Sequence, residues 1–289
     1  MVNIEEIKEK KSVRELLEFG IINIDKPSGP TSFDVSDFVR KTLGLRKTSH
    51  FGTLDPKVTG VLPIALNRAC KLTGFFLGED KEYVGIMRIH EPVSDEELQK
   101  AIKNFTGKIK QLPPVRSRVK RQEREREVKN FEILEKDGQD ILFKAEVQGG
   151  TYIRKLIHDL GIALGVGAHM LELRRIRAGI FMEEKSVDLY ELEKAVKEYE
   201  KNNEDSLKNI ILPGEVISQI YPVVQITEDS APRILRGQPI YEKNLAEKYN
   251  FNVDGKISVF SGDKFIGVFR IVNEGEVFAR PEFVLQPIP

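Results

Sequence analysis

The sequence predicts an α+β protein with a large first part and a small β-rich second part. Segments with helical and strand patterns alternate as far as the polar stretch 201–205, and only short strands separated by turns follow it. With 289 residues, 40% of them hydrophobic and 31% charged, the chain can bury a core and has room for two domains. We therefore expect a helical extension over residues 1–19, a main domain over 20–205 and a barrel domain over 206–289.

Short-range signals place the elements of the larger part in order. Thr31 or Ser32 can cap a helix, because a hydroxyl there accepts a hydrogen bond from a free N–H of the first turn. Ser94 and Glu97 form a capping-box pattern for a later helix. The expected elements are a helix over 1–20, a strand over 21–24, a helix to about 43, strands over 61–66 and 83–89, a helix over 94–105, strands over 128–134 and 140–147, and helices from 149 and over 186–200.

Residues 206–289 show the pattern of a small barrel. Short apolar or alternating segments at 223–226, 256–260 and 265–271 are separated by turns such as Ser261-Gly262-Asp263. The core of this domain is expected over about 221–289. The N-terminal helix is expected to pack on this barrel.

Composition excludes several classes of protein. No apolar run approaches the ~20 residues that a membrane-spanning helix needs, and the first residues mix charges instead of forming a signal peptide. We expect a cytoplasmic protein without a membrane partner. Cys70 is the single cysteine, which excludes an intrachain disulfide, and the four histidines show no paired spacing for a zinc site. No metal is expected.

Positive charge is concentrated in one segment although the chain as a whole has none in excess, with 45 basic and 45 acidic residues. Residues 105–129 hold nine basic side chains and three acidic ones. Such an excess is typical of a segment that contacts phosphates. For 122–127 a solvated face with alternating charge remains an alternative interpretation. The candidate phosphate contacts in the uninterrupted basic part are Arg116, Arg118, Lys120 and Arg121.

Five uncommon strings occur in order between about residues 20 and 185. They are Lys26-Pro27-Ser28-Gly29-Pro30-Thr31-Ser32, Gly52-Thr53-Leu54-Asp55-Pro56-Lys57-Val58-Thr59-Gly60-Val61-Leu62-Pro63, Lys81-Glu82-Tyr83, Gly150-Thr151-Tyr152-Ile153-Arg154 and Leu173-Arg174-Arg175. Together they resemble the TruB superfamily of pseudouridine synthases, which isomerise uridine in RNA. Residues 221–289, with Arg233-Ile234-Leu235-Arg236-Gly237-Gln238-Pro239, resemble a PUA domain, a small RNA-binding barrel.

Within that superfamily the chain looks most like the guide-RNA-dependent branch, the dyskerin family of H/ACA ribonucleoprotein enzymes. Without a long lysine-rich tail, it is similar to the archaeal members. The resemblance implies a pseudouridine synthase fold, with a mixed, largely antiparallel sheet and an appended PUA barrel. It also implies guide RNA, substrate RNA and three small accessory proteins as partners. The substrate would be rRNA, with tRNA as a further candidate.

The resemblance assigns roles to single residues. Asp55 is the expected nucleophile or base, and Arg154 is expected to form an ion pair with it. Tyr83 would pack against the target base and Leu173 would form a wall of the pocket. Lys26 would brace the catalytic loop. Further RNA contacts are implied at Arg174, Arg175, Arg236 and Gly237.

The reaction explains why these residue types are needed. Pseudouridine formation breaks the bond from ribose to N1 of uracil, turns the base and joins ribose to C5, without redox change or energy input, so no cofactor is expected. One ionised carboxylate can attack sugar or base, or remove a ribose proton, and later reverse the step. A nearby guanidinium favours the charged form of that carboxylate. Taken alone, Asp55 is a turn residue before a proline, and Tyr83 and Leu173 are ordinary core residues.

Two other functions stay open. The first is a stand-alone tRNA pseudouridine synthase. Such enzymes tend to carry Tyr-Ser-Ala after paired prolines, whereas Pro113-Pro114 is followed here by Val115-Arg116-Ser117-Arg118, which favours the guided form. The second is a non-catalytic RNA-binding scaffold, which the presence of both Asp55 and Arg154 disfavours.

Overall fold

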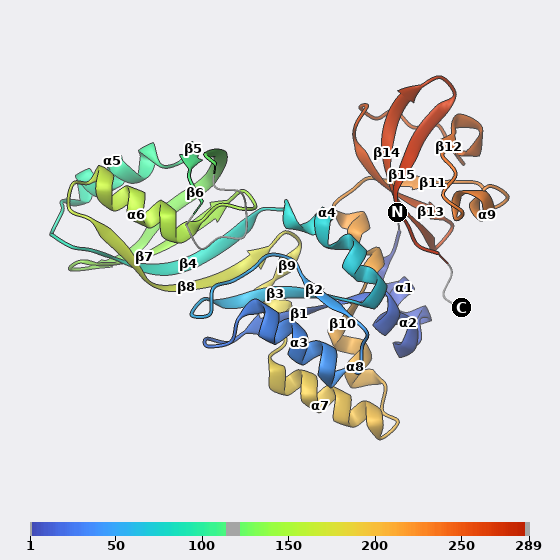
Figure 1. The fold of residues 1–289 in the computed structure, drawn as a ribbon, viewed down its shortest axis with the longest axis horizontal. Coiled ribbons are helices and arrows are strands. Elements are labelled where there is room, and N and C mark those ends of the chain that lie inside the picture. Colours follow the sequence, from blue (N-terminus) through green and yellow to red (C-terminus); the bar gives the residue numbers. More distant parts are fainter. Residues whose placement is uncertain (1, 114–121, 287–289) are drawn as a thin grey trace. The chain divides into compact units, whose positions relative to one another are not determined.

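The computed structural model describes residues 2–113 and 122–286 (Figure 1). Contacts between Cα atoms divide these residues into two units. The larger unit contains residues 22–66, 73–113 and 122–210, and the smaller unit contains 2–21, 67–72 and 211–286. No helix in the described part of the chain is both long and apolar enough to cross a membrane.

The larger unit is built on one mixed sheet. Its strands follow the order β1-β3-β8-β4-β7-β6-β5, while β2 pairs with β3 and β9 with β8. The β3–β8 pair is parallel, and β4 runs antiparallel to both of its neighbours, β8 and β7. The strands are β1 (Gly20–Lys26), β2 (Thr48–His50), β3 (Thr59–Leu66), β4 (Lys81–Ile89), β5 (Gly107–Gln111), β6 (Arg124–Asp137), β7 (Asp140–Val147), β8 (Ala168–Ala178) and β9 (Phe181–Met182).

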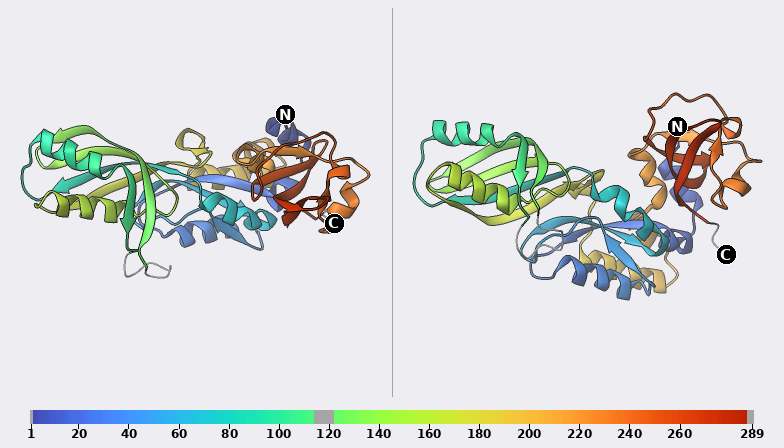
Figure 2. Two further views of the ribbon diagram at one scale, coloured as in Figure 1. Left: turned by 90° about the horizontal axis from the view of Figure 1, so that it is seen from above. Right: turned by 45° about the horizontal axis from the view of Figure 1, so that its top comes forward.

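Three helices of the larger unit, α3, α5 and α7, begin where side chains satisfy free N–H groups of the first turn. Thr31 with Asp34, Ser94 with Glu97, and Asp188 with Glu191 each form a capping box. Helices α5 and α6 lie on the same side of the sheet (Figures 1 and 2), where α6 contacts β8 and α5 contacts β6. The helices are α3 (Ser32–Thr42), α4 (Thr73–Leu77), α5 (Asp95–Asn104), α6 (Ile153–Ala163), η2 (Glu183–Lys185), α7 (Leu189–Glu200) and α8 (Asp205–Ile210).

The smaller unit contains a curled five-stranded sheet in the order β11-β13-β14-β15-β12. Its core is apolar and includes Val259, Ile266 and Phe269, which are fully buried. The N-terminal helices belong to the same unit, where Lys10 Nζ lies 2.6 Å from a carboxylate oxygen of Asp263. The elements are α1 (Ile4–Lys10), α2 (Val13–Glu18), η1 (Asn67–Leu72), β10 (Ile211–Pro213), η3 (Gly214–Gln219), β11 (Val223–Gln225), α9 (Ala231–Ile234), β12 (Ile240–Tyr241), η4 (Glu242–Asn244), β13 (Lys256–Ser261), β14 (Lys264–Glu274) and β15 (Val277–Val284).

The structure confirms the α+β class, corrects two predicted elements and contains strands that were not predicted. The expected helix over 1–20 is two helices, because Ser12 and Glu15 form a capping box that starts a new one. The strand expected from 128 begins at Arg124, where β6 pairs with β5. Strand β8 was not predicted at all. It is held between β3 and β4 by pairing on both sides, which no local pattern announces.

Candidate active site

Asp55 and Arg154 meet at the surface of the larger unit. Asp55 lies in the loop that precedes β3, and Arg154 lies in the first turn of α6. Arg154 Nη2 is 2.9 Å from Asp55 Oδ2, and the two side chains are 60% and 47% exposed. An ion pair this exposed adds only about 0–1 kcal/mol to stability. Its effect is therefore to orient an accessible carboxylate.

The backbone of the active-site loop, residues 52–58, is held by side chains from other elements. Ser32 Oγ accepts a hydrogen bond from Leu54 N at 2.8 Å and donates one to Leu54 O at 3.0 Å. The buried Lys26 Nζ donates to the carbonyl oxygens of Pro27, Pro56 and Val58 at 2.8–2.9 Å. These bonds confirm that Lys26 braces the loop. They fix the main chain on both sides of the Asp55 carboxylate.

Arg175 is a second brace, and its predicted contact with RNA is wrong. The side chain is only 1% exposed. Its Nε donates to Val61 O at 2.7 Å and its Nη2 donates to Gly52 O at 3.0 Å. The backbone is equally close, because a Cβ on Gly60 (φ 99°) would lie 2.2 Å from Arg175 O. A guanidinium enclosed in this way cannot reach a phosphate, and it ties β8 to the active-site loop instead.

Burial near this loop lowers the pKa of two lysine side chains. Burial lowers the pKa of Lys26, and the negative charge of Asp55 opposes that change. Lys81 is 4% exposed, and its ammonium donates to the backbone carbonyls of Leu77, at 2.9 Å, and Glu79. Burial and the nearby charge of Arg175 lower the pKa of Lys81 to about 8. The positively charged groups next to the active-site loop are therefore lysine ammonium groups, and their hydrogen-bond partners are mainly backbone carbonyls.

Tyr83 and Leu173 lie on neighbouring strands of the same sheet. Tyr83 on β4 is paired with Arg175 on β8, and Gly85 is paired with Leu173, so all four face the same side. Both predicted pocket residues are 8% exposed. Gly85 leaves room for Leu173, since a Cβ there would lie 2.9 Å from Leu173 Cδ1. Residue 174 of β8 pairs with Thr59 at the start of β3, the strand that follows the active-site loop. The side chains on this face of β4 and β8 therefore begin next to that strand.

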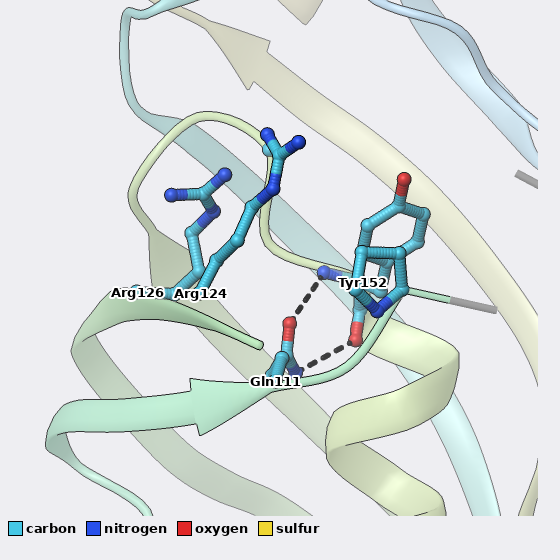
Figure 3. Close-up of a pocket in the computed structure, with 6 residues that line it drawn as sticks. Gln111, Arg124, Arg126 and Tyr152 are labelled. Carbon is cyan, nitrogen blue, oxygen red and sulfur yellow. Dashed lines mark hydrogen bonds between the residues drawn. The ribbon is translucent and has the colours of Figure 1, made fainter. Parts of the chain in front are cut away.

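A pocket of about 150 Å³ lies at the start of α6 (Figure 3). Gln111, at the end of β5, holds the helix start: its Oε1 accepts from Tyr152 N at 3.0 Å and its Nε2 donates to Tyr152 O at 3.2 Å. Pro113, Arg124 and Arg126 of β6, and Gly150 complete the wall. None of these residues was named as a single site residue, although both arginines belong to the basic segment 105–129. For the two arginines, the alternation of arginine and glutamate over 123–127 allowed two interpretations.

Comparison with known proteins identifies the family. Residues 40–94 match the N-terminal domain of TruB family pseudouridylate synthases, and residues 154–218 match the C-terminal domain of tRNA pseudouridylate synthase B. A probable tRNA pseudouridine synthase B of Methanopyrus kandleri is 46% identical over 230 residues, which are 79% of this chain and 68% of that protein. One from Sulfurisphaera tokodaii is 40% identical over 96% of this chain and 86% of its own length. The chain belongs to the TruB family of pseudouridine synthases.

Two solved structures are similar to this TruB-family chain over almost its whole length. A Cbf5–Nop10–Gar1 complex contains a chain that matches with a TM-score of 0.90 and 36% identity, over 97% of this chain and 89% of that one. An H/ACA ribonucleoprotein bound to a substrate RNA containing 2′-deoxyuridine matches with a TM-score of 0.88 and 34% identity, over 97% and 89%. The two matched family domains contain Asp55, Tyr83, Arg154 and Leu173.

The other predicted RNA contacts of this TruB-family enzyme differ in their surroundings. Arg116, Arg118, Lys120 and Arg121 lie outside the described residues. Arg174 is paired with Asp25, at 2.8 Å, and with Glu183, so carboxylates already compensate its charge. Arg236 and Gly237 are exposed in the smaller unit, and Gly237 has the positive φ of 89° that favours glycine. An RNA contact stays a prediction for these residues.

The fold brings together two histidines whose sequence positions suggested no pair. His90 Nε2 lies 2.9 Å from His169 Nδ1, at the opposite end of β4 from Lys81. Within residues 2–113 and 122–286, no group of three or more His, Cys, Asp or Glu side chains is arranged to hold a metal ion.

Proposed function

We propose that this enzyme isomerises uridine to pseudouridine in RNA under the direction of a guide RNA, as the catalytic subunit of an H/ACA-type particle. The observation that carries the proposal is the match to chains from Cbf5–Nop10–Gar1 and H/ACA ribonucleoprotein structures over 97% of the chain, with TM-scores of 0.90 and 0.88. Guide RNA, substrate RNA and three small accessory proteins are the proposed partners.

In this proposal Asp55 performs the chemistry. Its carboxylate is exposed and can be covered by a uridine that has left its stack. The bond from C1′ to N1 breaks, the uracil turns and C1′ joins C5. The hydrogen on C5 leaves as a proton, and N1 takes up a proton from solvent. Arg154 orients the Asp55 carboxylate while the base displaces water from both. Tyr83 packs against the base, and Leu173 limits where the base can turn.

The smaller unit would hold the guide. We propose that its curled sheet is a PUA domain that binds the ACA end of the guide RNA, with Arg236 and Gly237 on the contact surface. Both residues are exposed, and a glycine lets an RNA backbone approach the chain closely. The choice of uridine would then lie in base pairing with the guide, while the protein contacts shape and backbone.

A second candidate is guide-independent modification of tRNA. It is favoured by the names of the sequence relatives, which are probable tRNA pseudouridine synthases B. Both candidates use the same carboxylate, so the active site alone does not separate them.

A tritium-release assay tests the proposal, because joining C5 to ribose releases the hydrogen of C5. The chain, accessory proteins and guide RNA are incubated with RNA that carries tritium at C5 of the target uridine. Release is expected with the wild type and is expected to be lost with Asp55→Ala. Equal release from the two would refute the role of Asp55. Release from a tRNA without any guide would establish the second candidate and refute guide dependence for that substrate.

A further inference from the structure

Helix α6 carries Arg154 in its first turn but does not cap its own start. Its N-cap residue, Tyr152, makes no side-chain hydrogen bond to the first turn, whereas α3, α5 and α7 each begin with a capping box. Gly149 and Gly150 lie just before it, and Gly150 has a φ of 87°, which glycine adopts more readily than other residues. The local sequence therefore leaves the position of this helix start to contacts with other elements.

Gln111 supplies such a contact. It is the last residue of β5, it is buried, and its backbone is held in the sheet by pairing with Arg124 of β6. Its Oε1 accepts from Tyr152 N at 3.0 Å, and its Nε2 donates to Tyr152 O at 3.2 Å (Figure 3). Tyr152 O also accepts from Leu156 N at 2.9 Å, in the backbone hydrogen bond that begins α6. One amide thus fixes both polar backbone atoms of the N-cap residue, and only a side chain that both donates and accepts can do so.

The main chain links this contact to the ion pair of the active site. Arg154 follows Tyr152 by two residues, and its Nη2 lies 2.9 Å from Asp55 Oδ2. Both charged side chains are exposed, so burial does not hold the guanidinium in place. A shift of the helix start by ~1 Å would stretch this contact towards the limit of about 4 Å for an ion pair, and a misplacement of that size reduces rates about 100-fold. The position of the α6 start therefore decides whether the two charged groups meet.

We propose that Gln111 is a positioning residue for the isomerisation, which places Arg154 against Asp55 by holding the main chain of Tyr152. This inference rests on the proposed function, in which Asp55 performs the chemistry. The alternative is a purely structural amide, which stabilises the fold by satisfying buried backbone groups. The two roles differ in one respect. A structural amide matters equally with and without the guanidinium of Arg154, whereas a positioning residue matters to the rate only while that group is present.

A double-mutant cycle in the assembled particle with its guide RNA separates the two roles. Gln111→Met keeps the length of the side chain and removes both hydrogen bonds. With saturating protein and a single turnover, it should slow tritium release roughly 10- to 100-fold and change the affinity for substrate RNA by less than about twofold. In the Arg154→Ala background, the same substitution should slow release by less than about twofold. An equal factor in both backgrounds, or a loss confined to RNA affinity, would overturn the proposal.

Gln139→Met is the matched control, because it also removes a side-chain amide that is bonded to the backbone. Gln139 Nε2 donates to His90 O at 3.2 Å, at the opposite end of β4 from Lys81. This variant should leave both the rate of tritium release and the affinity for substrate RNA unchanged. A loss of rate equal to that of Gln111→Met would show that the effect is not specific to the start of α6, and would refute the positioning role.

Two further measurements keep the test decisive. If release by Arg154→Ala is too slow to measure, a crystal structure of Gln111→Met decides: Arg154 Nη2 should lie more than about 4 Å from Asp55 Oδ2, and an intact ion pair would refute the proposal. If Gln111→Met does not fold, Gln111→Glu replaces it in the cycle, since it keeps the acceptor for Tyr152 N and loses the donor to Tyr152 O. Failure of the proposed function would look different, because the wild type would then release no tritium. Failure of the role of Arg154 would appear as equal release from the wild type and Arg154→Ala.

Discussion

Replacing Arg175 by methionine should damage the active site without touching any residue that contacts substrate. Methionine keeps the apolar stem but removes the donors to Val61 O and Gly52 O, which are 2.7 and 3.0 Å away. Each buried carbonyl left without a donor costs about 1–3 kcal/mol, and the relief of burying a cation offsets part of that. We expect a net loss of about 2–4 kcal/mol in the free energy of unfolding.

That loss should be visible both as stability and as rate. For a unit of this size, about 2–4 kcal/mol corresponds to a drop of roughly 5–15 °C in Tm, measured by calorimetry. A shift of the active-site loop by ~1 Å would reduce kcat about 100-fold at a temperature where the variant is still folded. The tritium-release assay measures this rate under single-turnover conditions, which excludes an effect on product release.

Arg174→Met is the control, since it removes the same group from the neighbouring position. Arg174 is 35% exposed and pairs with Asp25 and Glu183, so its loss should cost only about 0–1 kcal/mol for each exposed pair. Its kcat should remain within a few-fold of the wild type. If both variants showed the same Tm and the same kcat, the bracing role of Arg175 would be refuted. If Arg175→Met showed a lowered Tm but a normal kcat, the role of Arg175 would be purely structural.

Three further outcomes follow from the same geometry. Between about pH 8, the folded pKa of Lys81, and about 10.5, its ordinary pKa, Lys81 binds fewer protons in the folded state than in the unfolded state. The free energy of unfolding of the wild type, measured relative to Lys81→Met, should therefore rise as the pH rises through this range. The rise is up to about 1.4 kcal/mol per pH unit, and a flat difference in chemical denaturation would contradict it. Gly60→Ala should lose about 2–4 kcal/mol, because its Cβ would meet Arg175 O, while Gly138→Ala (φ 59°, open space) should lose only about 1. Ser32→Ala should lower Tm and kcat together, since a buried N–H of the active-site loop loses its acceptor.

Local signals predicted the starts of α3 and α5 and several of the strands correctly. Capping boxes at Ser94 and strand alternation over 140–147 act within a few residues, and the structure contains both where they were expected. The break between α1 and α2 had a local signal too, the pair Ser12 and Glu15, which was missed because the apolar pattern continues across it. By contrast, Leu173-Arg174-Arg175 has no strand-like composition, and β8 exists because β3 and β4 both pair with it.

The error at Arg175 has a physical source. Arginine is almost never fully buried unless its donors are satisfied, so a sequence containing three nearby arginines is most simply read as a surface. The acceptors that bury Arg175 belong to residues 52 and 61, more than a hundred positions away. The contact between Asp55 and Arg154 is equally non-local. Family resemblance suggested that pair, whereas the chain's own patterns contain nothing that joins residues 99 positions apart.

The residues that hold the active-site loop in place explain structurally why the uncommon sequence strings occur together. Lys26 and Ser32 come from the first string and Arg175 comes from the last. Each binds backbone atoms of the active-site loop or of β3 beside it, and not the carboxylate itself. The main chain thus places Asp55, while its side chain remains exposed and pairs with Arg154. Substitutions of the bracing residues should therefore reduce both stability and activity. Asp55→Ala should instead remove activity with little change in Tm. An enzyme that must cover its carboxylate with a flipped base needs this arrangement, because a carboxylate fixed by buried partners would already be enclosed before the base arrived.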